Sequence, residues 1–190
     1  MNSKKLDLES QELLGRLWEE SQSPEEKERL QFARDALSFI FDIGLDDDFD
    51  DYRAGLDVNA PPLVIAAFSS REQADEWLRN HPHPPRHAKI LVAGEYHYVW
   101  YSRKHNDRTI RRSETLEYYL AEMIRDGVPP PAFTFDTQEE ANTWLHSQPE
   151  PPKQVFIQIA GELHLAAYHY RVNLRAIYPL SRAAKNVNWD

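Results

Sequence analysis

Two stretches of the chain decide the fold because they match each other without a gap. They read FSSREQADEWLRNHPHPPRHAKILVAGEYHYVWYSRKHNDRTIRR over residues 68–112 and FDTQEEANTWLHSQPEPPKQVFIQIAGELHLAAYHYRVNLRAIYP over residues 135–179. A shift of 67 positions aligns them with 17 identities in 45 positions, among them Trp77 with Trp144. Self-similarity at a fixed period indicates an internal duplication, so both copies are predicted to fold as the same supersecondary unit.

Each copy predicts a β-α-β-β unit. An apolar strand is followed by a helix whose apolar face carries Trp77 or Trp144, and both rings are predicted to lie in the core. Prolines end the helix, and Gly94-Glu95 and Gly161-Glu162, each between two apolar runs, predict type II′ hairpin turns. The first strands are expected at 63–68 and 132–135, and a further short strand near 108–110 and 174–177.

Outside the copies, the apolar spacing predicts helices. One spans Leu6 to Glu20 and the next begins at Ser23-Pro24, which together make an α-hairpin. The fold is therefore predicted to be α+β, an N-terminal α-hairpin followed by two tandem β-α-β-β repeats with pseudo-two-fold symmetry. The repeats are expected either to pair into one sheet or to stack through their tryptophan-bearing helices. The predicted parts are a helical acidic region over 1–60, the first repeat over 61–112, a connecting helix over 113–127, the second repeat over 128–180 and a frayed tail over 181–190.

The net charge of −9 lies entirely in the N-terminal third of the chain. Residues 1–60 carry 7 Lys/Arg and 16 Asp/Glu, whereas residues 61–190 carry 15 of each. A negative field repels phosphate and attracts basic surfaces, which argues against nucleic acid as a direct ligand and predicts a basic protein partner. Aromatic residues within the densest acidic stretch are typical of interface anchors. The predicted partner-binding residues are Asp46, Asp47, Asp48, Phe49, Asp50, Asp51 and Tyr52.

Two other interpretations of this acidic stretch stay open. A block of like charges is often only a solvated loop. An EF-hand-like calcium loop would use Asp46, Asp48 and Asp50 at its first, third and fifth positions. Asp51 would then stand where that loop needs glycine, and Asp57 where it needs glutamate, so no metal is expected there.

A Glu-x-His pair recurs in both copies and is the candidate for acid–base chemistry. Glu95 with His97, and Glu162 with His164, would each face one side of a strand. A catalytic pair is needed once, whereas a residue that shapes the unit recurs in both copies. The structural interpretation is therefore favoured, and these four residues are kept as a secondary ligand-site candidate.

The remaining polar clusters do not predict catalysis. His81, His83 and His87 are close in sequence, but the second copy does not repeat them, so a solvated loop is favoured over a metal site. A basic stretch from Arg103 to Arg112 could contact phosphate or pair with the acidic segment. Since the chain has no cysteine and no glycine-rich phosphate loop, no enzyme, cofactor or metal is predicted.

Two resemblances bear on function. The segment from Ala67 to Leu78 resembles the first half of SPOR-type peptidoglycan-binding modules, in which a strand ending in Phe-Ser leads into an alanine-containing helix. In its size, acidity, aromatic content and lack of catalytic motifs, the chain is similar to bacterial immunity proteins of polymorphic toxin systems. That similarity implies a cytoplasmic protein that binds and blocks a cognate toxin, often a nuclease with a basic cleft.

The predicted function is therefore a non-enzymatic protein-binding module, an immunity or inhibitor protein that neutralises a toxin through an acidic, aromatic surface. The alternative is a regulatory or ligand-binding domain with a cleft between the repeats. No apolar run approaches the roughly 20 residues of a membrane helix, and residues 1–9 lack the apolar region of a signal peptide. A cytoplasmic location without membrane contact is expected.

Overall fold

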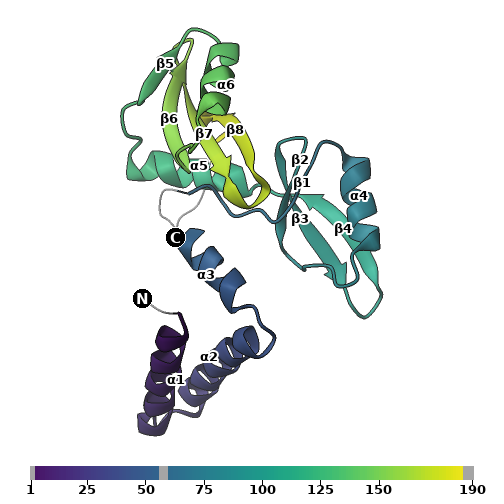
Figure 1. Cartoon of the computed structure of the whole chain (residues 1–190), viewed down its shortest axis with the longest axis vertical. Helices are drawn as coiled ribbons and strands as arrows, with labels where there is room; N and C mark the ends of the chain where they lie inside the picture. The colour runs from purple at the N-terminus through teal and green to yellow at the C-terminus, as the bar shows by residue number, and fades with distance from the viewer. Residues whose placement is uncertain (1–2, 56–59, 186–190) are drawn as a thin grey trace. The chain divides into compact units, whose positions relative to one another are not determined.

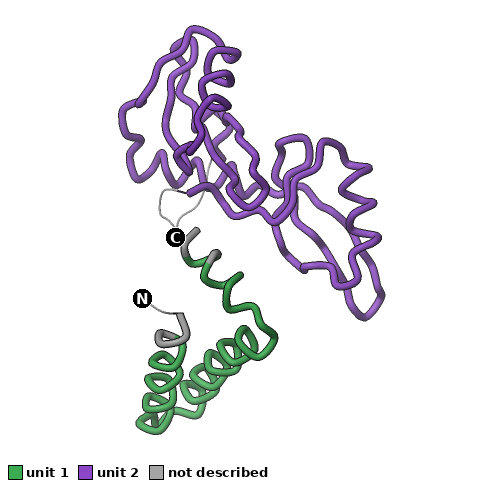
Figure 2. Tube along the Cα trace, in the orientation of Figure 1, with its two compact units in different colours: residues 1–57 green, residues 58–190 purple. Residues whose placement is uncertain are grey.

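The computed structural model describes residues 3–55 and 60–185 of the chain. It divides into two compact units, unit 1 over residues 1–57 and unit 2 over residues 58–190 (Figure 2). Unit 1 is helical and unit 2 holds two four-stranded sheets (Figure 1), so the predicted α+β class is confirmed. Within the described residues, no helix is both long enough and apolar enough to cross a bilayer.

Unit 1 consists of helices α1 (Ser3–Glu20), α2 (Pro24–Asp42) and α3 (Asp46–Gly55). The Ser23 hydroxyl accepts a hydrogen bond from the Glu26 backbone N–H at 3.3 Å, and Pro24 takes the first helical position of α2. This cap satisfies one of the free N–H groups at the helix start. α1 and α2 pack against each other, which confirms the predicted α-hairpin.

The structure corrects the interpretation of the acidic stretch as a solvated loop, because residues 46–55 form helix α3. Gly44, with φ of +70°, reverses the chain after α2, and the Leu45 N–H donates to the Ile40 carbonyl at 2.9 Å. Asp46, Asp47 and Asp48 then occupy the first turn of α3. Negative side chains there interact favourably with the partial positive charge of the helix start, which offsets part of their mutual repulsion.

Each half of unit 2 contains one four-stranded sheet with a helix between its first two strands. Sheet 1 has the order β1-β2-β3-β4 and sheet 2 the order β5-β6-β7-β8; in both, the first pair is parallel and the others antiparallel. The elements of the first half are β1 (Ala67–Phe68), α4 (Arg71–Asn80), β2 (Lys89–Val92), β3 (Glu95–Ser102) and β4 (Asp107–Arg112). The second half has α5 (Thr115–Asp126), β5 (Phe133–Phe135), α6 (Gln138–Ser147), β6 (Gln154–Ile159), β7 (Glu162–His169), the 3-10 helix η1 (Tyr170–Val172), β8 (Leu174–Pro179) and the 3-10 helix η2 (Leu180–Arg182).

The strand pairing is equivalent in the two copies. Phe68 pairs with Val92 in sheet 1, and Phe135 with Ile159, 67 positions further on, in sheet 2. The fourth strand, predicted only as a short extra segment, is present in both sheets, so the unit is β-α-β-β-β. The duplicated topology is thereby confirmed, while the pseudo-two-fold relation between the copies stays a prediction.

The hairpin turns differ from the predicted type. The two central residues are Ala93-Gly94 and, in the second copy, Ala160-Gly161, and all four have φ between +48° and +86°. Positive φ at both central positions defines a type I′ turn, whose twist matches that of the flanking strands. The type II′ prediction at Gly-Glu was therefore wrong by one residue, because the alanine before each glycine also adopts the left-handed conformation.

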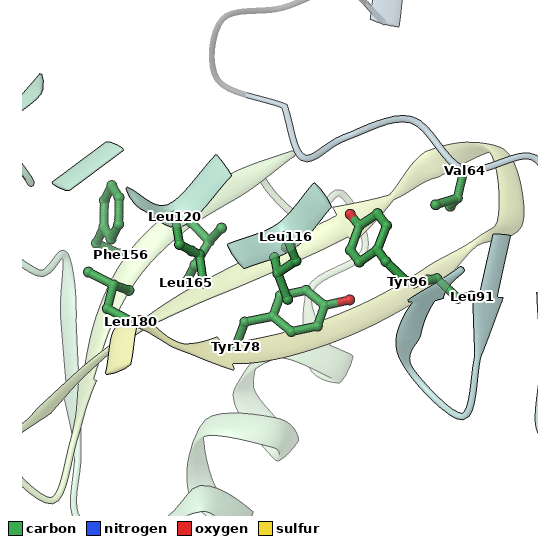
Figure 3. Close-up of a cluster of buried hydrophobic side chains, with 10 residues drawn as sticks. Val64, Leu91, Tyr96, Leu116, Leu120, Phe156, Leu165, Tyr178 and Leu180 are labelled. Carbon is green, nitrogen blue, oxygen red and sulfur yellow. The ribbon is translucent and has the colours of Figure 1, made fainter. Parts of the chain in front are cut away.

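The hydrophobic core of unit 2 consists of three clusters. α4 packs on one face of sheet 1 through Ala74 and Leu78, and α6 packs on one face of sheet 2 through Ala141 and Leu145. The third cluster joins the opposite faces of both sheets to α5 (Figure 3). Its buried members are Val64, Leu91, Tyr96, Leu116, Leu120, Phe156, Leu165, Ala167, Tyr178 and Leu180.

This arrangement corrects both predicted ways of joining the repeats. The copies neither share a continuous sheet nor stack through α4 and α6. The tryptophans also differ from the prediction, since Trp77 and Trp144 are half-buried at the cluster edges rather than buried. Trp77 lies against Phe68 with ring centroids 5.4 Å apart, and Trp144 against Phe135 at 5.5 Å.

Candidate functional site

Helix α3 carries all the predicted partner-binding residues. Phe49 and Tyr52 lie one helical turn apart, and their rings stack with centroids 6.4 Å apart. Asp47 and Asp48 are exposed, and Asp46 and Asp50 are half-buried. The structure thus places an aromatic pair beside carboxylates, as an acidic contact surface requires. Asp51 lies in the same helix.

The helical conformation also bears on the calcium alternative. A calcium loop wraps its ligands around the ion, whereas a regular helix places Asp46 and Asp50 on one side and directs Asp48 away from them. The last position of that spacing, Asp57, lies outside the described residues. Within the described chain, no three His, Asp or Glu side chains are grouped so that they could hold a metal ion.

A second apolar stripe on α2 was missed by the sequence reasoning. One stripe, which includes Leu37 and Ile40, is half-buried, as expected for the side that packs on α1. The other consists of Phe32 and Phe39 with Ile43, the residue directly after α2, exposed by 76%, 61% and 51% respectively. Their spacing of seven and four residues puts them on one helix face. This second stripe could have been found in the sequence, because α2 has more apolar residues than the one face packed on α1 can bury.

The Glu-x-His pairs do not form acid–base couples. In each copy the histidine Nδ1 lies 3.0 Å from the backbone carbonyl of the glutamate two residues before it, His97 with Glu95 and His164 with Glu162. The glutamate carboxylates have other partners, since Glu95 accepts from Arg182 at 2.8 Å and Glu162 accepts from the Ser181 hydroxyl at 2.7 Å. The repeated feature is thus a local contact between imidazole and backbone at the start of β3 and β7.

Arg182 joins the two copies at the start of the predicted frayed tail, of which residues 186–190 lie outside the described residues. Its guanidinium binds both carboxylate oxygens of Glu95 and also reaches Glu117 on α5 at 3.4 Å. The hydrogen bonds from Arg182 hold the pKa of the Glu95 carboxyl below its ordinary value. The Ala184 N–H donates to the Glu117 carbonyl at 2.9 Å, so the described part of the tail packs on α5.

The histidines of the proline-rich loop have separate surroundings. His81 lies edge-on to Trp77 with ring centroids 5.2 Å apart, and His87 lies edge-on to Trp100 at 6.0 Å. Their rings therefore belong to two different aromatic contacts of sheet 1, and His83 is exposed. The preference for a solvated loop over a metal site at these three histidines stays a prediction.

The basic stretch has two kinds of member. Arg108 donates to the carbonyls of Leu78, Arg79 and His81 at 2.8–3.0 Å, which caps the end of α4. Arg175, its counterpart, donates to the Gln148 carbonyl after α6 at 3.2 Å. This shared arginine therefore satisfies orphan carbonyls at a helix end in both copies. Lys104 also has a basic counterpart, Arg171, and the other members occur in the first copy alone.

A cleft lies between α5, residues 127–132 and β6. Its volume is about 620 Å³. Met123 and Phe156 supply apolar lining and Glu122 and Asp126 supply carboxylates. At its edge the Tyr119 hydroxyl donates to Gln154 Oε1 at 2.6 Å. This volume is within the range of small-molecule sites.

Comparisons of the chain with protein-family models, with curated proteins and with solved structures find no match.

Proposed function

We propose that the protein is a non-enzymatic protein-binding module and that it inhibits a basic partner protein, as an immunity protein inhibits its toxin. The observation that carries this proposal is the exposed apolar stripe of Phe32, Phe39 and Ile43 on α2, within a unit that has 7 basic and 16 acidic residues. A helix that is apolar on two faces has a second face available for a partner.

The apolar stripe accounts for affinity in this proposal. Covering a fully exposed Phe or Ile side chain is worth about 1.5–3 kcal/mol, so three such residues are sufficient for a small hot spot. The Phe49–Tyr52 pair on α3 adds aromatic area of the kind that is enriched in interface cores. Contacts through these apolar and aromatic side chains provide binding without a catalysed reaction, as proposed for a non-enzymatic module.

The acidic residues account for partner choice and association rate. Residues 1–57 carry the whole net charge of −9, since residues 58–190 balance at 15 basic and 15 acidic side chains. Complementary charge raises the association rate more than it slows dissociation, and salt weakens the effect. A basic surface, such as the substrate cleft of a nuclease, is the partner chemistry that this unit fits.

Co-expression with the product of the adjacent gene tests the proposal, with host growth and complex formation as readouts. Phe39→Ser should weaken the complex at least about tenfold through faster dissociation, because the side chain is exposed and its loss leaves the helix intact. Replacing the five aspartates of 46–51 with Asn should slow association and flatten its salt dependence. The matched control replaces five exposed acidic residues of unit 2 with amides: Glu76, Glu114, Asp136, Glu139 and Glu150.

Two results would contradict the proposal. Equal loss of binding in the control would mean that net charge alone matters. Light scattering could instead show that the parent protein is a dimer and that Phe39→Ser is a monomer that still binds the partner. That result would mean that a second copy of the chain covers the stripe.

A second candidate function is small-ligand binding in the cleft beside α5. The cleft volume of about 620 Å³ and its mixed apolar and carboxylate lining favour it. Glu122 and Asp126 lie in the last two turns of α5, where the helix end also favours positive charge. The ligand would be an amphipathic cation, and Met123→Trp, which fills the cleft, should abolish its binding in calorimetry.

A further inference from the structure

Sheet 1 has a basic and aromatic face on the side away from α4. Ile90, Val99 and Ile110 pack under α4, so their strand neighbours point to the opposite side. Paired across the strands on that side are Lys89 with Tyr98 and Tyr98 with Arg111. We call Arg86, Lys89, Tyr98, Trp100 and Arg111 the aromatic-basic face.

Trp100 is at the centre of this face. The Arg111 guanidinium lies over its ring at 4.8 Å and that of Arg86 at 5.9 Å. Both arginines are exposed, and Trp100 and Tyr98 are half-buried. Stacking on the ring holds each guanidinium plane while its edge N–H groups remain available to an anion.

The cations of the aromatic-basic face lack the carboxylate partners that other arginines have. Arg71, Arg112 and Arg182 all form ion pairs. Within residues 3–55 and 60–185, no Asp or Glu pairs with Arg86, Lys89 or Arg111. These three positive charges therefore lie beside two aromatic rings, and no carboxylate of the described residues pairs with them.

The duplication shows that folding does not require four of these residues, whereas the fifth, Arg86, has a basic counterpart in Lys153. The positions equivalent to Lys89, Tyr98, Trp100 and Arg111 in the second copy are, in that order, Phe156, Leu165, Ala167 and Tyr178. All four are buried beneath α5 in the third core cluster. On this face of sheet 1, Leu91 and Tyr96 are buried in the third cluster, whereas Tyr98 and Trp100 are half-buried and Arg111 is exposed. The part of the face that is core in the second copy is thus accessible, aromatic and cationic in the first, and a purely structural role does not explain that composition.

The charge of unit 2 is divided between its copies. Residues 61–112 carry 9 Lys/Arg and 5 Asp/Glu, a net of +4, whereas residues 113–190 carry 6 and 10, a net of −4. The acidic excess that argues against nucleic acid belongs to unit 1, and the argument does not apply to the first copy. Flat aromatic rings with interleaved arginines suit bases and phosphates together.

We propose that the aromatic-basic face binds single-stranded nucleic acid. Bases stack on Tyr98 and Trp100, and phosphates bind Arg86, Lys89 and Arg111. A shallow hollow of about 400 Å³ continues the surface from Tyr98 to Tyr118 on α5, and the Glu114 carboxylate in its lining directs phosphates to the Arg86 end. The proposal concerns unit 2 and does not depend on the partner of unit 1.

Fluorescence anisotropy with the full chain tests the proposal, using labelled oligothymidylate and oligouridylate of about ten nucleotides, within the usual range of site sizes. We expect binding at low salt, with a slope of log K against log salt of about −2, since each of three phosphate contacts contributes roughly −0.7. The two probes separate DNA from RNA as the source of the strand.

Substitutions assign the binding to this face. Trp100→Leu should weaken binding about tenfold or more through lost base stacking, whereas Trp100→Phe keeps a ring and most of the affinity. Arg111→Gln should weaken binding and reduce the salt slope by about 0.7. The matched control is Arg79→Gln on α4, which removes the same charge from the same copy but on the helix side of sheet 1, and should change binding less than twofold.

Four results would overturn the proposal: no binding of either probe at low salt, equal effects of Arg79→Gln and Arg111→Gln, full affinity in Trp100→Leu, or competition by polyglutamate as strong as by the unlabelled oligonucleotide. The last would assign the face to an acidic protein. Urea unfolding of Trp100→Phe and Trp100→Leu separates lost stacking from lost fold, because Trp100→Phe must both fold and bind.

Discussion

We expect the protein to lose stability in mild acid because His169 is buried. Its imidazole is buried between the copies, where Nε2 lies 3.1 Å from the Tyr178 hydroxyl and the ring stands edge-on to Tyr96 at 5.8 Å. The other titratable groups around it are Tyr168, Tyr170 and Arg171, which line a small hollow beside it. None of these offers a negative charge to an imidazolium, and burial lowers the pKa of His169 to about 4.

The sign of the effect follows from proton linkage. In the unfolded chain His169 has its ordinary pKa of 6.5, so as the pH falls below 6.5 the unfolded state takes up a proton that the folded state excludes. Stability is therefore complete above 6.5 and falls until the pH reaches about 4. One pKa unit corresponds to about 1.4 kcal/mol, so the whole interval is worth about 3 kcal/mol, of which about 2 kcal/mol is lost between pH 7 and pH 5.

Urea unfolding between pH 7 and pH 5 measures this loss. Trp18 is the one tryptophan of residues 1–57, so a Trp18→Phe background makes tryptophan fluorescence report on unit 2. With a urea dependence of about 2 kcal/mol per molar, the midpoint should fall by about 1 M. In His169→Gln the midpoint should stay nearly constant over the same range, whereas the exposed control His83→Gln should behave as the parent does.

A midpoint in the parent that is independent of pH from 7 to 5 would refute the reasoning, as would a full pH-dependent fall in His169→Gln. The Glu95 carboxyl does not contribute to the change in the unfolding midpoint between pH 7 and pH 5. Its pKa is lowered by Arg182, so its stabilisation is complete above its ordinary 4.5 and is lost as the pH falls through the lowered value. That window lies below pH 5.

Further expectations concern the repeats and the acidic helix. Trp77→Ala and Trp144→Ala should each lower the free energy of unfolding by about 2–4 kcal/mol, less than a fully buried tryptophan, and a loss below about 1 kcal/mol in both would mean that the rings serve binding. Arg108→Met should cost about 1–3 kcal/mol in chemical denaturation through the carbonyls it leaves without a donor, with Arg79→Met as the exposed control. Gly94→Ala should cost about 1 kcal/mol, because φ is +79° and no neighbour crowds a new Cβ; an unchanged unfolding midpoint would argue against the type I′ turn. Replacing the aspartates of 46–51 with Asn should leave the circular dichroism of unit 1 unchanged or slightly more helical, and a loss of helix would show that these charges are needed for α3.

Local sequence patterns were sufficient to predict the helices and hairpins of the repeats. The 67-residue shift, the proline clusters and the Gly-Glu sequences can be read from the sequence alone, and they predicted the helices, the hairpins and the duplication. The turn type was wrong because Ala93 adopts a positive φ, which the twist of the paired strands imposes and which alanine does not prefer by itself. The helix over 46–55 was missed because a block of like charges suggests a loop unless the stabilisation of the first turn is counted.

The two candidate surfaces also differ in whether the sequence alone could reveal them. The aspartates with Phe49 and Tyr52 could be found in the sequence because they are contiguous. The aromatic-basic face could not, because Arg86, Lys89, Trp100 and Arg111 come from three separate segments that the strand register brings together.

By itself, the sequence determined the duplication, the α+β class and the location of the acidic charge, since each depends on local pattern or on composition. Only the tertiary structure decided that the outer face of sheet 1 is buried at Leu91 and Tyr96 but accessible around Trp100, and that Arg182 reaches Glu95 across 87 positions. Two copies with nearly the same internal pattern differ in what lies against their outer faces, and that depends on packing between segments distant in the chain.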